Sequence, residues 1–383
     1  MKSVGTIVEY NPFHNGHIYH LQQLRQKTNA DVVIAVMSGN FVQRGEAAII
    51  DKWERTKVAL QNGIDLVIEL PIYWAVQPAH LFAYGAVKLL NALKVNALAF
   101  GAEHADANFK KLTSVKLDAQ KFKQFNQTYA TLYNQQLEQQ TGFSLNQSND
   151  ILAYFYILAQ QKINPNLNLY PIQRKISRHT DSNLTDKSIV SASAIRNTLF
   201  AYSNDAEKLL RGKLPNNLLQ LLMKQIDQVI NTNWSCEMWT LLRHQLLVMS
   251  INQLQQIYQM SEGLEYRLKK SAEQNDTWND FLESIKTKRY TYTRLQRVCL
   301  YTLLNITNKE IKQQQSYLRL LGFSERGRQY LQKYKKNFTL PLISRFDLHS
   351  DISLDLDYRA GKIYELLTGK EQDLRHKPIM YLN

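Results

Sequence analysis

The chain contains 383 residues, of which 44% are hydrophobic and 21% are charged. These proportions are ordinary for a globular protein, so extended disorder is excluded, and the length predicts about two domains. Lys and Arg together number 47 against 33 Asp and Glu, and the resulting charge of +14 indicates a polyanionic partner. The two cysteines, Cys236 and Cys299, lie far apart in the sequence. They exclude a disulfide scaffold and a cysteine-based zinc site, and they fit a reducing compartment.

The sequence contains no apolar run long enough to cross a membrane, and residues 1–10 lack the apolar segment of a signal peptide. We therefore expect a cytoplasmic protein with no membrane partner. Nothing in the sequence indicates an obligate protein partner.

The first 200 residues alternate short apolar runs with helical patterns. Runs typical of buried strands cover residues 4–8, 31–37, 66–70, 97–100 and 169–172. Helical spacing of apolar residues covers residues 16–28, 52–62 and 79–92. This alternation predicts a Rossmann-like α/β fold in which a parallel sheet carries helices on both faces and binds its ligand at the carboxyl ends of the strands.

From about residue 205 onward the pattern changes to consecutive amphipathic helices. They are predicted over residues 209–230, 238–260, 263–271, 278–286, 293–305 and 309–321. Residues 341–383 are expected to form a small mixed or helical appendage. We therefore place a domain boundary near residue 200, with an α/β domain over residues 1–200 and a basic, mainly α-helical domain over residues 201–383.

A histidine motif follows the first predicted strand directly, in the segment EYNPFHNGH (9–17). Asn11-Pro12 breaks the strand, and Gly16 allows a helix to begin close to a ligand. His14 and His17 are expected to face the cavity above the sheet, where free N–H groups of a helix N-terminus favour phosphate. Imidazoles can donate hydrogen bonds to a phosphoryl group as its charge develops. Taken alone, the pair could equally be a surface feature or half of a metal site, but no acidic or cysteine ligands lie nearby.

A serine-rich motif opens a predicted helix far downstream, at Ser191, Ser193 and Arg196. The hydroxyl groups can cap exposed N–H groups or bind phosphate, and the arginine can pair with a pyrophosphate leaving group. Standing alone, this would be an ordinary helix cap followed by a surface arginine. Together with the histidine motif, it predicts a nucleotide site.

The HxGH motif after the first strand, combined with SxSxIR near residue 196, resembles the HIGH-type nucleotidyltransferases, which act on the α-phosphate of ATP and expel pyrophosphate. Longer segments are similar to one family among them, the bacterial tRNA(Met) cytidine acetate ligases. These segments are VGTIVEYNPFHNGHIYHL (4–21), MSGNFVQRGEAAIIDKWER (37–55), ELPIYWAVQPAHLFAYGAV (69–87), FGAE (100–103), SNDILAYFY (148–156), KTKRYTYTRLQRV (286–298) and LGFSERGRQYL (321–331). The resemblance covers essentially the whole chain.

The resemblance implies a nucleotidyltransferase-like domain for ATP and acetate over residues 1–200 and a tRNA-binding domain over residues 201–383. ATP, a substrate accompanied by Mg²⁺, would activate acetate as acetyl-adenylate. The acetyl group would pass to N4 of the wobble cytidine of elongator tRNA(Met), giving N4-acetylcytidine with release of AMP and pyrophosphate. No group of acidic residues in the sequence indicates a dedicated metal site, and no general base is evident.

The resemblance also implies an ATP site with His14 and His17 at the developing charge and Arg196 at the pyrophosphate. Carried over by position, the ATP-binding residues are Ile7, Val8, Glu9, Tyr10, Asn11, Pro12, Phe13, His14, Asn15, Gly16, His17, Ile18, Tyr19, His20, Gly101, Asn149, Arg174, Ser191, Ser193 and Arg196. Without the family, three of these have simpler interpretations: Gly101 as a turn residue, Asn149 as a helix cap and Arg174 as a solvated arginine.

Two further groups of basic residues are candidates for binding the other substrates. Acetate needs a cation for its carboxylate, and the candidates are Arg44 and Lys52. Basic residues interleaved with tyrosines suit RNA phosphates and unpaired bases, although a solvated helical face is the simpler alternative. These tRNA-binding candidates are Lys286, Lys288, Arg289, Tyr290, Tyr292, Arg294, Arg297, Arg326 and Arg328.

Two other classes of function are possible on the residues alone. An adenylyltransferase acting on a small metabolite would share both motifs, but it would leave the basic helical half without a role. A non-catalytic RNA-binding protein with a decayed nucleotide pocket would not need to retain both histidines, both serines and Arg196.

Overall fold

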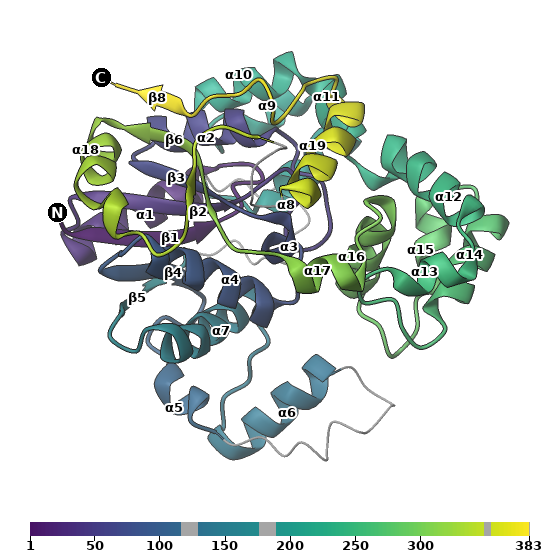
Figure 1. The fold of residues 1–383 in the computed structure, drawn as a ribbon, viewed down its shortest axis with the longest axis horizontal. Coiled ribbons are helices and arrows are strands. Elements are labelled where there is room, and N and C mark those ends of the chain that lie inside the picture. Colours follow the sequence, from purple (N-terminus) through teal and green to yellow (C-terminus); the bar gives the residue numbers. More distant parts are fainter. Residues whose placement is uncertain (116–128, 176–188, 348–353, 383) are drawn as a thin grey trace.

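The computed structural model describes residues 1–115, 129–175, 189–347 and 354–382. A central sheet with helices on both faces forms one part of the molecule, and a lobe made only of helices forms the other (Figure 1). None of the helices in the described ranges is long and apolar enough to cross a membrane.

The sheet has eight strands among the described residues, in the order β5-β4-β1-β2-β3-β6-β7, with β8 paired to β6. Strands β1 to β5 are parallel, whereas β6 runs antiparallel to β3. The strands are β1 (Ser3–Val8), β2 (Val32–Ser38), β3 (Leu66–Leu70), β4 (Ala97–Ala102), β5 (Asn168–Gln173), β6 (Leu318–Ser324), β7 (Leu342–Ile343) and β8 (Ile379–Tyr381).

Both faces of the sheet are covered, which explains why its central strands are continuous apolar runs. Ile34 and Val36 of β2 pack on the face of α4 and α7, whereas Val33 and Ala35 pack on the face of α1 and α2. The helices of this part are α1 (Asn15–Thr28), α2 (Lys52–Gln61), α3 (Ile72–Ala75), α4 (Ala79–Ala92), α5 (Phe109–Thr113), α6 (Tyr129–Thr141), α7 (Ser148–Ile163), α8 (Ala192–Ala201), α9 (Ala206–Leu210), α10 (Asn216–Lys224), α11 (Ile226–Asn231), α18 (Glu325–Tyr334) and α19 (Asp355–Thr368). The predicted Rossmann-like α/β class is confirmed.

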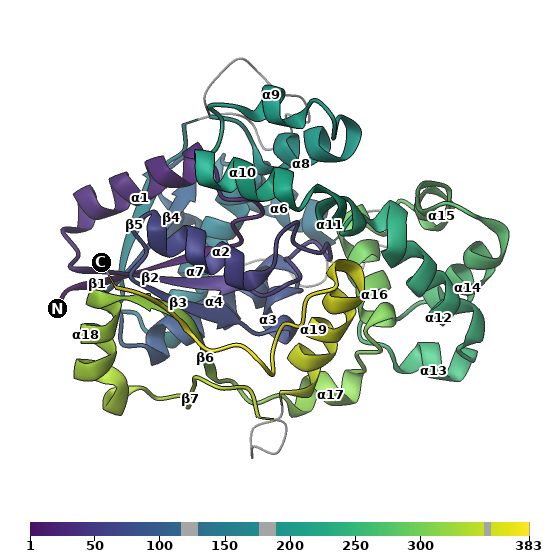
Figure 2. The same cartoon turned by 90° about the horizontal axis from the view of Figure 1, so that it is seen from above.

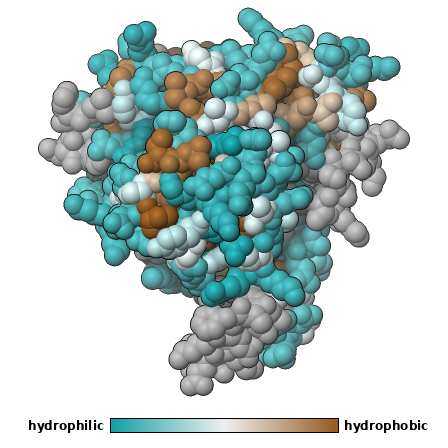
Figure 3. Space-filling model, turned by 90° about the vertical axis from the view of Figure 1, so that its right-hand side faces the viewer, coloured by the Kyte–Doolittle hydropathy of each residue, from teal (hydrophilic) through white to brown (hydrophobic). Residues whose placement is uncertain are grey.

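The helical lobe packs around stacked tryptophans. Trp234 and Trp278 lie with their ring centroids 4.5 Å apart, in a core that continues onto Phe41 and Val76 of the sheet part. The lobe contains the kinked segment Trp234–Met238, α12 (Trp239–Val248), α13 (Ile251–Gln256), α14 (Leu264–Gln274), α15 (Trp278–Ile285), α16 (Tyr292–Leu303) and α17 (Asn308–Gln313). Its outward side is mostly hydrophilic, with separate apolar patches (Figure 3).

The helix predicted over residues 309–321 is wrong in its second half. The helix ends at Gln313, and Leu318–Ser324 forms β6, paired with β3 from far upstream in the chain. A short apolar run buried on both faces looks the same whether it belongs to a helix or to a central strand, and only the distant partner strand decides.

The structure also divides the chain differently from the expected boundary at residue 200. Helices α8 to α11 pack on the same sheet face as α1 and α2 (Figure 2). The C-terminal residues return to the sheet through β6, β7 and β8. The helical lobe therefore covers residues 234–313, inserted between two stretches that build the α/β part.

Candidate active site

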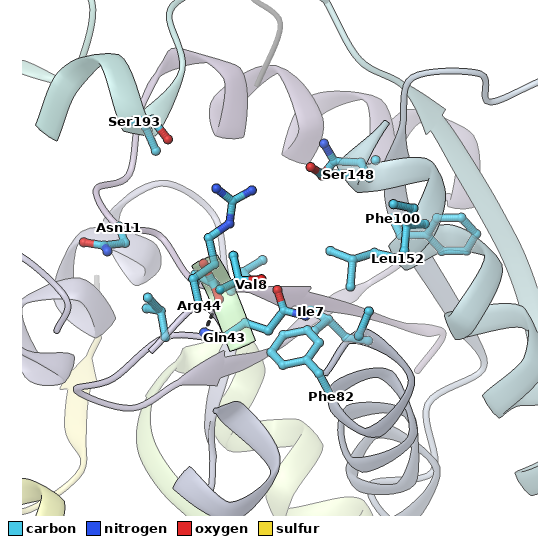
Figure 4. A pocket seen from close by; sticks show the side chains of 18 of the residues that line it. Ile7, Val8, Asn11, Gln43, Arg44, Phe82, Phe100, Ser148, Leu152 and Ser193 are labelled. Carbon is cyan, nitrogen blue, oxygen red and sulfur yellow. Dashed lines mark hydrogen bonds between the residues drawn. The ribbon is translucent and has the colours of Figure 1, made fainter. Parts of the chain in front are cut away.

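A pocket of about 780 Å³ lies at the carboxyl ends of β1, β4 and β5 and extends to the helical lobe. Its walls come from the segment after β1, the loop before α2, the N-termini of α4, α7 and α8, and the start of α16. In Figure 4, Arg44 reaches into this space, with Asn11 and Ser193 on one side and Leu152 and Phe100 on the other. This is the position that a parallel α/β sheet provides for a ligand.

The two histidines of the first motif are fixed at the N-terminus of α1. His14 is the cap residue: its Nδ1 accepts from the N–H of Gly16 at 3.0 Å, and Nδ1 of His17 accepts from the N–H of His14 at 3.2 Å. The ring centroids are 3.9 Å apart. Because both Nδ1 atoms accept, each neutral ring carries its proton on Nε2 and is a donor through that atom.

The glycine of the motif is required by this close arrangement. A Cβ on Gly16 would lie 2.8 Å from Cε1 of His14, so a larger residue would displace the capping ring. The chain enters the motif through Tyr10, with φ of 50°, and a cis peptide bond between Asn11 and Pro12. Sequence and geometry thus agree on a tight turn between strand and helix.

The serine-rich motif meets the histidine motif across the pocket. Ser191 caps α8 by accepting from the N–H of Ala194 at 3.0 Å. Arg196 donates to the carbonyl of Asn11 at 2.8 Å and to the carboxylate of Glu46 at 3.2 Å. These two hydrogen bonds anchor the Arg196 guanidinium to the turn before His14 and to the loop before α2.

The wall at the end of β4 is organised by Glu103, a residue that sequence reasoning missed. Its carboxylate accepts from Nδ2 of Asn149 at 2.5 Å and from the backbone N–H groups of Asn149 and Asp150 at 3.1 and 3.0 Å. Arg174 donates to Oδ1 of Asn149 at 3.3 Å. Gly101 lies beside them: a Cβ added at this glycine would be 3.4 Å from Cγ of Arg174. The carboxylate directly after a strand, in the segment FGAE, is the signal that could have revealed this role.

Burial shifts the pKa of several titratable groups on the pocket wall, among them His20 and Glu9. Desolvation, helped by the charge of Arg174, lowers the pKa of His20 to about 4, so this ring is neutral at pH 7. Desolvation raises the pKa of Glu9, although the N–H of Gln43 and the charges of Arg44 and Arg196 act in the opposite direction. Glu9 accepts from the N–H of Gln43 at 2.8 Å and so fixes the loop that carries Arg44.

Four residues of the expected ATP-binding segment do not line the pocket: Pro12, Phe13, Asn15 and Ile18. Phe13 is fully buried in the core, and Asn15 donates to the carbonyl of Gly212 at 2.9 Å. A continuous range overstates the site, because side chains along a turn and a helix point in several directions. The other expected ATP-binding residues all line the pocket.

Lys52 is a wrong candidate for acetate. Its ammonium group is buried, 2.9 Å from Glu69 and 2.7 Å from Asp373, and Arg319 joins the same carboxylates. It does not line the pocket, whereas Arg44 does. Sequence patterns do not reveal this cluster, because Asp373 comes from the far end of the chain.

The tRNA-binding candidates fall into two separate groups. Arg289, Arg294 and Arg297 line the pocket. Arg326 and Arg328 lie on α18, at the opposite side of the sheet from the lobe (Figures 1 and 2).

The tyrosines and lysines near α16 have different environments. Tyr290 is 4% exposed, and its ring lies 4.6 Å from the guanidinium of Arg294, so it supports that arginine and cannot stack on a base. Lys286 lies 5.2 Å from the ring of Tyr292, which is exposed, and Lys288 is exposed as well.

The parallel sheet and the histidine–arginine pocket at its carboxyl edge define a nucleotidyltransferase of the HIGH type. A family model described as HIGH Nucleotidyl Transferase matches residues 1–377.

Known relatives identify the family more narrowly. A protein of Limosilactobacillus reuteri, named tRNA(Met) cytidine acetate ligase, is 47% identical over 99% of this chain and 100% of its own length. A protein of Leuconostoc citreum with the same name is 47% identical over 100% of this chain and 98% of its own. The chain therefore belongs to the family of tRNA(Met) cytidine acetate ligases.

Solved structures agree with this assignment. Thermotoga maritima TmcAL in its apo form superposes with a TM-score of 0.89 at 30% identity, over 100% of both chains. The same protein bound with alpha-thio ATP superposes with a TM-score of 0.85 at 31% identity, again over 100% of both chains.

Proposed function

We propose that this protein is an ATP-dependent ligase that activates acetate as acetyl-adenylate and transfers the acetyl group to N4 of the wobble cytidine of elongator tRNA(Met). The observation that carries the proposal is the meeting of His14, His17 and Arg196 in one pocket. The full-length relatives named tRNA(Met) cytidine acetate ligase supply the substrates.

ATP would lie across the carboxyl edge of the sheet. The wall formed by Gly101, Asn149 and Arg174, with the neutral ring of His20 beside it, suits the adenosine. The Nε2 donors of His14 and His17 would hold the α-phosphate. Ser193 and Arg196 would hold the pyrophosphate portion: Ser193 lies across the pocket from Ser148 at the start of α7 (Figure 4), and Arg196 donates to Ser193 at 3.5 Å.

In the first step an acetate oxygen attacks the α-phosphorus, and the bond to pyrophosphate breaks. The imidazole donors stabilise the negative charge that builds on the phosphoryl oxygens. Arg196 stabilises the leaving group, and its anchoring to Asn11 and Glu46 reduces the reorganisation needed. The product is a mixed anhydride with AMP as a good leaving group.

In the second step N4 of cytidine attacks the acetyl carbonyl, the bond from the carbonyl carbon to the phosphate oxygen breaks, AMP leaves with the electron pair, and N4 loses one proton to solvent. The exocyclic amine of cytosine is a weak nucleophile, so holding it against the anhydride is the main contribution of the site. The pocket continues to the lobe surface at Arg289 and Thr291, which gives a base of the RNA a path to the anhydride.

Mg²⁺ is expected to accompany ATP. Among the residues that the structure describes, no three His, Cys, Asp or Glu side chains are grouped so that they could hold a metal ion. Mg²⁺ bound through phosphate oxygens and water would not need such a group.

The tRNA would bind across the lobe side of the pocket mouth. Lys286, Lys288, Arg289 and Arg294 form a basic rim there, and the exposed ring of Tyr292 is available for stacking on an unpaired base. Arg326 and Arg328 do not belong to the same rim, because α18 lies at the opposite side of the sheet from the lobe. Arg328 is also paired with Glu325 at 2.7 Å.

The test is to incubate the protein with ATP, labelled acetate and deacylated tRNA, and then to follow the label. We expect acetate-dependent AMP release and label in a single anticodon cytidine. AMP formation that is unaffected by tRNA, with no labelled RNA, would instead support an adenylyltransferase for a small metabolite. Absence of ATP turnover would leave only a role in RNA binding.

A further inference from the structure

Arg297 is a buried cation that no carboxylate of the described residues balances. The residue on α16 is 8% exposed, and its Nε is buried with no hydrogen-bond partner among the residues that the structure describes. The titratable groups that act on it are Tyr301, Tyr258 and another cation, Arg294; within the same residues no Asp or Glu pairs with it. Burial of an unpaired charge is costly, so this guanidinium indicates an anionic ligand.

The neighbours of Arg297 place it against the N-terminus of α4. Tyr301, one helical turn later, donates to the carbonyl of Val76, and Tyr258 donates to the side chain of Gln77 at 3.2 Å. The segment leading into α4 therefore lies against α16. The backbone of Arg297 packs against Gly45, where an added Cβ would come within 2.8 Å of the Arg297 nitrogen. Arg297 also lines the pocket.

The start of α4 provides donors for the same anion. Its cap residue is Pro78, which makes no side-chain cap, so no side chain covers the first N–H groups of this 14-residue helix. Pro78, Ala79 and His80 line the pocket together with Arg297. Burial, helped by the charge of Arg297, lowers the pKa of His80, which disfavours a further cation at that ring. A helix N-terminus and a guanidinium without a partner thus face one space.

Two apolar side chains, Val8 and Phe82, line the same pocket, and Figure 4 shows them beside Gln43 and Arg44. Phe82 lies on α4 one helical turn after Pro78, and Gly45, which follows Arg44, packs against the Arg297 backbone. A ligand with one carboxylate and one small apolar group would find a cation, N–H donors and apolar side chains in this pocket. A phosphodiester of a large RNA fits this buried position poorly, whereas Arg289, with a side chain 41% exposed, is accessible at the rim.

We infer that Arg297 and the N-terminus of α4 form the carboxylate subsite of the acid substrate, with Val8 and Phe82 against its methyl group. This inference rests on the proposed function and reassigns Arg297 from the tRNA to acetate. One carboxylate oxygen stays on the guanidinium while the other forms the new bond to the α-phosphorus. The phosphorus–oxygen bond to pyrophosphate breaks, pyrophosphate leaves with the electron pair, and no proton is transferred.

The experiment measures acetate-dependent exchange of labelled pyrophosphate into ATP, without tRNA, for Arg297→Gln and Arg297→Lys. Loss of a charged hydrogen-bond partner is expected to raise the KM for acetate roughly 10- to 100-fold in Arg297→Gln. The KM for ATP should stay within about twofold, since the adenosine and triphosphate contacts lie elsewhere. Arg297→Lys keeps the charge without the planar fork and should fall between wild type and Arg297→Gln. Arg267→Gln, which removes an exposed arginine of α14 away from the pocket, is the matched control.

A second measurement does not depend on turnover. Saturation-transfer NMR with acetate as the probe should give a signal with the wild-type protein and with Arg267→Gln, but not with Arg297→Gln. Equal acetate signals for wild type and Arg297→Gln would overturn the inference. So would an unchanged KM for acetate combined with weaker tRNA binding, which would return Arg297 to the RNA. If wild type binds acetate through Arg297 but shows no exchange, the subsite stands and the proposed ligase activity fails.

Discussion

Two buried cations in this molecule were both candidates for binding a substrate, and their surroundings differ completely. Lys52 has a side chain 2% exposed and lies against Glu69 and Asp373. Arg319 is the fourth group of this cluster, in which two cations pair with two carboxylates. Arg297 is almost as buried, at 8%, but no carboxylate pairs with it among the described residues.

The contrast separates a cation that stabilises the fold from one that awaits a ligand. The cluster around Lys52 joins α2, β3, β6 and the C-terminal segment, so its charges compensate each other inside the folded chain. Arg297 instead lines the pocket, where a bound anion could supply the opposite charge. Burial alone therefore does not distinguish structure from function; the presence or absence of an opposite charge does.

The largest expected effect comes from breaking the satisfied cluster. Lys52→Met leaves two buried carboxylates with one cation, and removal of one partner from such a cluster costs about 3–5 kcal/mol of unfolding free energy. Urea denaturation measures the loss. Arg297→Met is the comparison variant: because it removes an unpaired charge, the ligand-free protein should be at least as stable as wild type. The contrast fails if Arg297→Met destabilises the protein as much as Lys52→Met.

The second effect tests the other end of the pocket. His14→Ala removes one of two donors to the phosphoryl group and should lower the rate of acetate-dependent pyrophosphate exchange about 10²- to 10³-fold. Affinity for tRNA, measured by filter binding, should be nearly unchanged, because the rim lies on the lobe. His244→Ala, at an exposed position of α12, is the matched control. A parallel loss of tRNA binding in His14→Ala would mean that the two ends of the pocket do not act independently.

The sequence predicted the parallel sheet and the motifs around His14 and Arg196, because these features are local. Buried β-branched runs define strands, and a glycine and a serine define helix starts. That the two motifs meet required only the rule that ligands bind at the carboxyl edge of such a sheet.

The sequence could not reveal features that depend on distant partners. The pattern over residues 309–321 predicts a helix that runs into β6, because the pairing partner of this strand, β3, is far upstream. Lys52 appeared to be an accessible cation because Asp373 lies near the other end of the chain. Glu103 was overlooked because its role comes from the N-terminus of α7, which folds back onto it.

A smaller effect is expected near Arg174, an arginine of the pocket that, unlike Arg297, has a hydrogen-bond partner in Asn149. Glu103→Gln places an amide N–H group among the N–H donors that the carboxylate now accepts from, so Asn149 and Arg174 lose their fixed positions. We expect the KM for ATP to rise about tenfold, a loss of about 1.4 kcal/mol, with kcat for exchange within about twofold. Glu273→Gln, at an exposed position of α14, should leave both constants unchanged. A fall in kcat with an unchanged KM would instead place Glu103 in the chemical step.

The smallest effect concerns the neutral ring of His20, whose pKa is lowered from 6.5 to about 4. As pH falls from 7.5 to 5.5, the unfolded chain binds a proton at this residue while the folded chain does not. Stability supplied by the neutral folded ring is therefore present above pH 6.5 and is lost as the solution becomes more acidic, by about 1 kcal/mol at pH 5.5. His20→Leu cannot bind this proton, so its unfolding free energy should fall less than that of wild type over the same interval in urea denaturation. All other titrating groups are common to the two proteins and cancel in the difference. Identical pH slopes would show that the His20 ring takes up its proton over the same pH range in the folded and the unfolded protein, and therefore that burial does not lower its pKa.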